Sequence, residues 1–215
     1  MVIRIRRPIL ALFLVLAIMT LVNIAQFSLF PVIKSAVSSQ MGRKIPVYSV
    51  DVPDKRVSVT LDATWGAKQT ADLLAVLDKH GVKATFFLAG YWIEEYPDHV
   101  RMIASKGHEI GNHTYSHPHL NSLDIESIKK ELNRCSDMIE NLTGTRPTLF
   151  RPPFGEYSNK VIEAAEACGL ETIQWDVDSL DWQNLSASAI QSRVLSRVQP
   201  GSIILFHNNG LHTVE

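Results

Sequence analysis

Residues 57–88 read VSVTLDATWGAKQTADLLAVLDKHGVKATFFL, and this stretch decides the fold. Residues 57–61 alternate β-branched and polar side chains, as a strand does. Residues 69–80 place their leucines on one helical face, and Gly81 suits the end of that helix. Residues 84–88 then indicate a buried strand. A helix between two buried strands predicts parallel pairing through a right-handed crossover.

The same alternation continues along the chain. A short strand is expected at 45–50, further strands at 109–112, 148–150, 172–177 and 202–206, and further helices at 98–106, 125–142, 161–168 and 187–198. Ser122 or Asp124 is available as the N-cap of the helix that begins at Ile125. This order favours a βα barrel or a doubly wound sheet.

Composition places limits on the class of protein. The chain has 215 residues, a formal net charge of -1 and 46% hydrophobic residues, which suits one domain beside a terminal apolar segment. No nucleic-acid partner is expected, because phosphate binding needs a clustered basic face. Cys135 and Cys168 are interpreted as two buried thiols, with a disulfide as the alternative.

The N-terminus carries the clearest topological signal. After Arg4, Arg6 and Arg7 no charged residue appears until Lys34. An apolar helix of that length crosses a bilayer, and the flanking charges keep its N-terminus in the cytoplasm. We therefore expect a membrane anchor at 1–33, a stalk at 34–55 and an extracytoplasmic domain at 56–215. A cleaved signal peptide, which would make the protein secreted, is the alternative.

Reactive side chains gather directly after the predicted strands. They are Asp62, His113, His117, Arg151, Asp178, Asp181 and His207. The carboxyl ends of parallel strands open on one face, so these positions are expected to share one pocket. His113 and His117 are four residues apart, and on a helical turn two such histidines can bind one metal ion.

Five segments in this order resemble the motifs of the polysaccharide deacetylase family, also called the NodB-homology domain. They are Thr60-Leu-Asp62 with Trp65-Gly66, His113-Thr-Tyr-Ser-His117, Arg151-Pro-Pro-Phe154, Asp178-Ser-Leu-Asp-Trp182 and Leu205-Phe-His207. The resemblance extends from about residue 45 to the C-terminus and is strongest to the sporulation-associated branch. It implies an α/β fold, a distorted (β/α)7 barrel. In this chain the transmembrane helix expected from the apolar N-terminal segment precedes that barrel.

The resemblance also implies a role for each residue. Asp62 is the general base, His207 the general acid, and His113 and His117 are metal ligands. Arg151 holds the base, and Asp178 or Asp181 positions that arginine. Substrate binding falls to Trp182, Leu205, Pro153 and Phe154. The implied cofactor is a divalent metal, zinc in the first place, with cobalt or manganese as alternatives.

The function expected from this resemblance is hydrolysis of N-acetyl groups in cell-wall glycan, at peptidoglycan N-acetylglucosamine or N-acetylmuramic acid. Two departures bear on it. Most family members carry a second aspartate after the general base, as third metal ligand, and here that position is Ala63. The chain also ends at Glu215, where a further helix and strand are expected, which suggests a truncated domain. Two alternatives remain, a degenerate glycan-binding protein of spore or wall assembly and an O-acetyl polysaccharide esterase.

Overall fold

The computed structural model describes residues 42–215. The predicted anchor at 1–33 and the first part of the predicted stalk lie outside the described residues. Residues Lys44–Glu215 form a compact unit, which is the part described below. Among the described residues, no helix has the length and apolar character that crossing a membrane requires.

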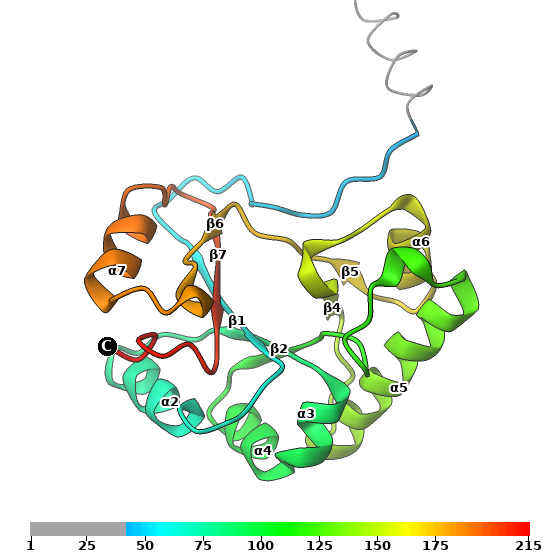
Figure 1. Ribbon diagram of the computed structural model, residues 1–215, viewed down its shortest axis with the longest axis horizontal. Helices are drawn as coiled ribbons and strands as arrows, with labels where there is room; N and C mark the ends of the chain where they lie inside the picture. Colours follow the sequence, from blue (N-terminus) through cyan, green and yellow to red (C-terminus); the bar gives the residue numbers. More distant parts are fainter. Residues whose placement is uncertain (1–41) are drawn as a thin grey trace, which may run out of the picture. The chain divides into compact units, whose positions relative to one another are not determined.

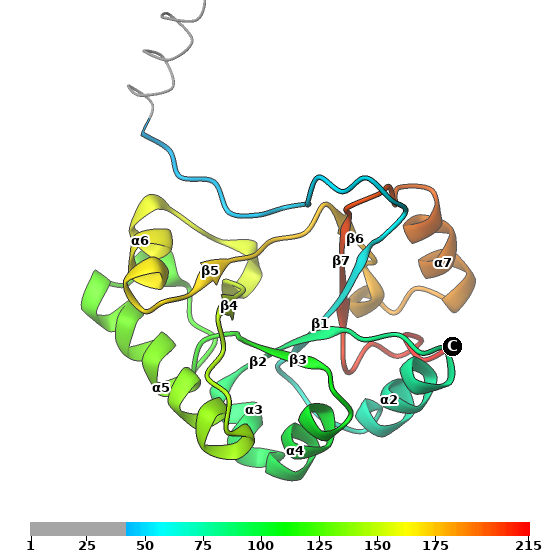
Figure 2. The same ribbon diagram turned by 180° about the vertical axis from the view of Figure 1, so that it is seen from behind.

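The core of the unit is a parallel sheet of seven strands in the order β5-β4-β3-β2-β1-β7-β6. The strands are β1 (Ser58–Ala63), β2 (Thr85–Leu88), β3 (Glu109–Asn112), β4 (Leu149–Phe150), β5 (Glu171–Thr172), β6 (Val177–Asp178) and β7 (Ile203–His207). The sheet curls into an open barrel with the helices outside it (Figures 1 and 2). The expected parallel α/β sheet is therefore confirmed. Because β1 pairs with both β2 and β7, Asp62 lies level with Phe87 and His207.

Helices follow the strands and cover the outer face of the sheet. They are α2 (Thr70–Lys79), α3 (Gly90–Glu95), α4 (Pro97–Ser105), α5 (Ile125–Thr143), α6 (Asn159–Ala167) and α7 (Ala187–Leu195), with short 3-10 turns η1 (Leu120–Ser122), η2 (Pro153–Gly155) and η3 (Asp181–Gln183). Asp124 caps α5, since its carboxylate accepts the backbone N–H of Ser127 at 2.8 Å. Of the two predicted caps, Asp124 is the one that the structure uses.

Apolar side chains of β1 and β2 pack against α2, α3 and α4 in the larger core cluster, where Phe86, Leu88 and Trp92 are fully buried. A second cluster joins α5 and α6 around Leu132 and Phe150. Both clusters lie between the sheet and its helices, so the inner face of the sheet at the strand ends is left for polar side chains.

The sheet is open between β5 and β6, and an extended segment crosses the opening. In place of the predicted strand at 45–50 there are two isolated bridges, Val47 with Ile173 and Ser49 with Ser202. Val47 donates its N–H to Thr172 O at 3.0 Å, and Val50 donates to Gly201 O at 2.9 Å. The segment packs so closely that a Cβ on Gly201 would come within 1.7 Å of Val50 O.

Three local features differ from what the sequence suggested. The expected strand at 172–177 is two short strands, β5 and β6, separated by an irregular stretch. Helix α3 was not expected, because its apolar residues continue directly from the buried strand β2. Residues 113–117 are not helical, since Thr114 and His117 have positive φ values of 66° and 54°.

Both cysteines are free thiols, as the first interpretation held. Cys135 is buried in α5, whereas Cys168 at the end of α6 is only half-buried. Burial raises the pKa of the Cys135 thiol to about 12, so it is uncharged at neutral pH.

Candidate active site

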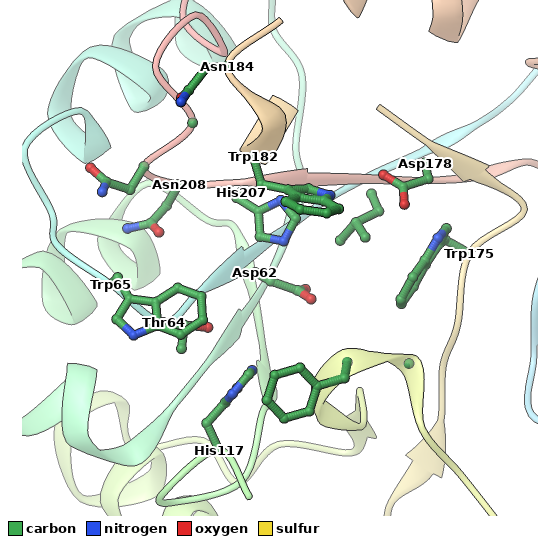
Figure 3. A pocket seen from close by; sticks show the side chains of 15 residues that line it. Asp62, Thr64, Trp65, His117, Trp175, Asp178, Trp182, Asn184, His207 and Asn208 are labelled. Atoms are coloured by element: carbon green, nitrogen blue, oxygen red, sulfur yellow. The ribbon is translucent and has the colours of Figure 1, made fainter. Parts of the chain in front are cut away.

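A pocket of about 600 Å³ opens at the carboxyl ends of the strands. Its walls include Asp62 from β1, His117 after β3, Asp178 from β6 and His207 from β7 (Figure 3). The volume lies within the range of small-molecule sites, about 300–1,000 Å³. Five sequence segments therefore contribute to one site, with Phe154 after β4 as the fifth.

Asp62 is buried and paired with a buried arginine. Its Oδ1 accepts a hydrogen bond from Arg151 Nη1 at 2.8 Å, and Arg151 is fully buried. Burial alone would raise the pKa of Asp62, but the charge and hydrogen bond of Arg151, with His113 and His207 nearby, hold that pKa below its ordinary value. Asp62 is therefore an anion at neutral pH.

The expectation that Asp178 or Asp181 positions Arg151 is wrong. Arg151 donates instead to Thr60 Oγ1 at 2.9 Å and to Gln174 O at 3.1 Å. Neutral oxygens suffice here, because Asp62 already balances the guanidinium charge. Asp178, at the end of β6, accepts the backbone N–H of Leu180 at 2.9 Å.

Two histidine rings lie beside Asp62. The ring centroids of His113 and His117 are 4.9 Å apart, and His113 Nε2 is 3.6 Å from Asp62 Oδ2. His113 Nδ1 donates to the carbonyl oxygen of Arg151 at 2.7 Å, which leaves Nε2 with its free lone pair. Burial lowers the pKa of His113, and burial with the neighbouring His113 lowers that of His117 to about 3.

Two neutral imidazoles, one of them oriented by a backbone carbonyl, are the donors that a zinc ion prefers. A third protein ligand is missing. Ala63 is fully buried and offers a methyl group, and Asp62 is bound to Arg151. Among residues 42–215, no group of three or more His, Cys, Asp or Glu side chains is placed to hold a metal ion. The site thus offers two suitable ligands for a divalent ion, His113 and His117, and Ala63 has no donor atom to serve as the third.

His207, in the part of the pocket wall formed by β7, is paired with the carboxylate of Asp181. Its Nδ1 donates to Asp181 Oδ1 at 2.8 Å, and its backbone N–H donates to Oδ2, also at 2.8 Å. Thr213 donates its hydroxyl to the same Oδ2 at 2.7 Å. Burial would lower the pKa of His207, but the hydrogen bond to Asp181 and the charges of Asp62, Asp181 and Asp178 raise it. His207 can thus hold a proton near neutral pH.

The expected substrate-binding residues fall into two groups. Trp182, Phe154 and Leu205 line the pocket, and the first two are 56% and 52% exposed. Pro153 is buried and is not part of the pocket lining, so it supports the turn η2 instead of meeting substrate.

Several lining residues received no role from the sequence. They are Thr64, Trp65, Gly155, Trp175, Asn184, Asn208, Asn209 and Gly210. Trp65 stands in the first motif, three residues after Asp62, and that position was the available signal. Trp175 lies inside the stretch that was expected to be one continuous strand, so no signal distinguished it.

Comparison with known proteins gives consistent results. The family model described as polysaccharide deacetylase matches residues 49–173. An uncharacterized protein of Bacillus subtilis, YlxY, is 36% identical over 175 residues, which are 81% of this chain and 55% of that protein. A peptidoglycan-N-acetylglucosamine deacetylase of Bacillus cereus is 38% identical over 152 residues, 71% of this chain and 55% of that protein. The chain thus spans about half the length of these two relatives.

Among solved structures, a CE4 family pseudoenzyme from Bacillus anthracis has a TM-score of 0.75 and 34% identity, covering 79% of this chain and 59% of that one. A mutant of the same pseudoenzyme, with restored enzymatic activity, has a TM-score of 0.74 and 35% identity. Its coverage is 79% of this chain and 64% of that chain. The neighbours therefore include proteins with and without turnover.

Proposed function

Because the chain belongs to the polysaccharide deacetylase family, we propose that its site hydrolyses N-acetyl groups of cell-wall glycan. Peptidoglycan N-acetylglucosamine or N-acetylmuramic acid is the proposed sugar, by analogy with the relatives whose names state it. The observation that carries the proposal is the presence of two reactive groups in one pocket, Asp62 held by Arg151 and His207 held by Asp181.

These groups supply the two proton transfers of amide hydrolysis. Asp62 accepts a proton from the attacking water while the water oxygen forms a bond to the acetyl carbon. The C–N bond then breaks as the amine nitrogen takes a proton from the His207 imidazolium. The products are acetate and a free amino sugar. The lowered pKa of Asp62 and the raised pKa of His207 favour the required starting forms, a carboxylate and an imidazolium.

We propose His113 and His117 as the protein ligands of a divalent metal, zinc or else cobalt or manganese. A metal held by these two residues would polarise the acetyl carbonyl and stabilise its developing negative charge. Catalytic zinc sites usually have three protein ligands, so affinity here is expected to be weaker than in a complete site.

A second function is favoured by one observation, the buried methyl group of Ala63 at the third ligand position. In this alternative the pocket binds cell-wall glycan without hydrolysing it. The aromatic walls and the amides of the pocket do not depend on the metal, so binding would remain.

One set of variants separates the two functions. Acetate released from peptidoglycan fragments is measured with the full chain in the presence of Zn²⁺, Co²⁺ or Mn²⁺, together with bound metal. Hydrolysis by the native chain, reduced at least about a hundredfold in His207→Ala, supports deacetylation. Glycan binding without acetate from the native chain, with metal and activity appearing in Ala63→Asp, supports the second function. Ala63→Asn is the matched control, because it adds similar volume without a carboxylate.

For location, we propose a single-pass membrane protein whose domain lies outside the cytoplasm. The support is the charge-free run between Arg7 and Lys34, with arginines on its N-terminal side. Protease added to intact protoplasts should remove the domain, whereas a protected domain would contradict the proposal. Release of the domain into the medium would instead indicate a cleaved signal peptide.

A further inference from the structure

Trp65 is a large apolar side chain that the fold leaves in water at the edge of the pocket. It is 63% exposed and lines the pocket, whereas Trp92, from the adjoining helix α3, is fully buried. Ligand pockets are lined mainly by apolar and aromatic side chains, so an exposed ring in a pocket wall is placed to contact a ligand. The roles derived above for Asp62 and His207 do not use it.

The backbone beneath Trp65 is fixed. Gly66 adopts a left-handed conformation, with φ of 64°, which a side chain would strain. Its carbonyl oxygen accepts two hydrogen bonds, from Trp92 Nε1 at 2.7 Å and from Asn208 Nδ2 at 2.9 Å. The Trp65 ring also makes an edge contact with His117, at 5.4 Å between centroids. A ring presented by a rigid turn loses little entropy when a ligand covers it.

A polar group accompanies the ring. The Asn209 side-chain amide lies 3.3 to 3.4 Å from the point where a Cβ on Gly66 would be, and Asn209 is an exposed residue of the pocket lining. Pyranose rings have C–H groups on their faces and hydroxyl groups around their edges. An aromatic ring and an amide, which both donates and accepts, on the wall of the same pocket match that pattern.

The position of Trp65 relative to the reacting groups decides which sugar it meets. In Figure 3, Trp65 lies on one side of Asp62, and Trp175 and Asp178 lie on the other. Trp182 lies beside His207 in the same view. A sugar on Trp65 is therefore displaced from the one whose acetyl group faces Asp62 and His207.

We propose that Trp65 and Asn209 form a subsite for the pyranose next to the reacting sugar. The ligand is then an amino-sugar oligomer instead of a single sugar. This inference rests on the proposed glycan function of the same pocket, whether the bound glycan is hydrolysed or only held.

The test compares binding of a tetramer of β-1,4-linked N-acetylglucosamine with binding of the monosaccharide. The full chain in detergent is titrated and followed by ligand-observed NMR. We expect Trp65→Ala to weaken tetramer binding about tenfold and to leave monosaccharide binding unchanged. Trp65→Phe should retain most of the tetramer affinity, and Asn209→Ala should weaken tetramer binding alone. Leu195→Ala, which removes an equally exposed side chain of α7, is the matched control.

Three results would overturn the inference: an unchanged tetramer affinity in Trp65→Ala, equal losses for tetramer and monosaccharide, or no tetramer binding by the native chain. Because the experiment measures binding and not turnover, it tests the subsite even if the proposed deacetylation is wrong. If acetate is released but Trp65→Ala binds the tetramer normally, the deacetylase function stands and the subsite does not.

Discussion

Asp62 and Arg151 form an ion pair that the fold removes almost completely from water. Arg151 is 0% exposed and Asp62 is 5% exposed. Desolvating two charges is costly, and their attraction compensates only when the remaining polar atoms are also bonded. Thr60 and Gln174 provide part of that bonding. The pair therefore depends on both partners, and loss of one leaves an uncompensated buried charge.

Replacement of Arg151 by methionine tests this dependence. Arg151→Met keeps an unbranched side chain of similar reach but leaves Asp62 buried without its partner. We expect the free energy of unfolding to fall by about 3 kcal/mol, as for other buried pairs broken on one side. Urea denaturation of the full chain, followed by circular dichroism, measures the change.

Arg146 supplies the control for that variant. It bonds to Asp137 and Glu140 on the surface of the unit. Arg146→Met should cost at most about 1 kcal/mol, because exposed ion pairs contribute little. Equal losses in the two variants would mean that burial of the Asp62–Arg151 pair has no special cost.

The partner of Asp181 shows where sequence reasoning stops at the level of single residues. Asp178 and Asp181 stand three apart after a predicted strand, and one or the other was expected to position Arg151. In the structure, Leu180 has a positive φ of 56°, and Asp181 turns inward to His207. A left-handed leucine has no sequence signal, because that conformation is disfavoured for its side chain. The pocket could be predicted from the strand ends, but not the pairing within it.

Helix α5 holds the loop that carries the two histidines. Glu131 accepts the backbone N–H of Ser116 at 2.7 Å and the Ser116 hydroxyl at 2.9 Å. Asn112 donates to Leu132 O and Ser136 Oγ on the same helix, at 2.7 and 2.9 Å. These contacts stabilise a loop with unfavourable backbone angles at Thr114 and His117. The position of His117 therefore depends on a helix that contributes no residue to the pocket lining.

Removal of the Glu131 carboxylate should loosen this loop. In Glu131→Leu, we expect the Ser116 amide to exchange its hydrogen about tenfold faster, because a hydrogen bond to a charged group is lost. Glu131→Gln retains an accepting oxygen and should show a smaller change. Hydrogen exchange followed by NMR gives both rates, and an unchanged rate in Glu131→Leu would show that α5 does not restrain the loop.

Elements with a strong apolar period were the ones that the sequence predicted well. Helix α5 was expected at 125–142 and extends over Ile125–Thr143. The spacing of His113 and His117 suggested a helical turn, but four-residue spacing also occurs in many other turns. The stretch at 172–177 is apolar enough for one strand, yet only its two ends pair with neighbouring strands. Pairing depends on distant partners, and periodicity within one segment does not report them.

At the scale of the whole molecule, four histidines link folding to pH. Burial is the largest cause that lowers the pKa of His108, His113 and His117 from an ordinary value of 6.5. The pKa of His207 is raised, because Asp181 and other carboxylates outweigh its burial. The first three remain neutral in the folded chain at pH values where the unfolded chain takes up protons. Above pH 6.5, the folded chain keeps a proton on His207 that the unfolded chain releases.

The chain should therefore be most stable near pH 6.5, the ordinary histidine value. Below that pH, unfolding takes up protons on the histidines whose pKa is lowered in the folded chain, so stability falls on acidification. Each such proton lowers the free energy of unfolding by about 1.4 kcal/mol per pH unit. Above it, the stabilisation from His207 is lost as the pH rises through the raised pKa of that residue. Urea midpoints between pH 5 and 8.5, with a chelator present, measure the loss of stability on the acidic side of this maximum (the acid limb) and on the alkaline side (the alkaline limb).

A variant of His108 tests the loss of stability on acidification without changing the pocket. His108 lies outside the pocket lining, where its Nδ1 accepts the backbone N–H of Ala84 at 3.2 Å. His108→Gln keeps an accepting oxygen but does not titrate, so it should make the loss of stability on acidification less steep and leave the alkaline side unchanged. Asp181→Asn should act in the opposite way, because it removes the charge that favours protonated His207 and flattens the alkaline limb. A stability that is constant or rises on acidification would contradict the assignment of neutral, buried histidines to the folded chain.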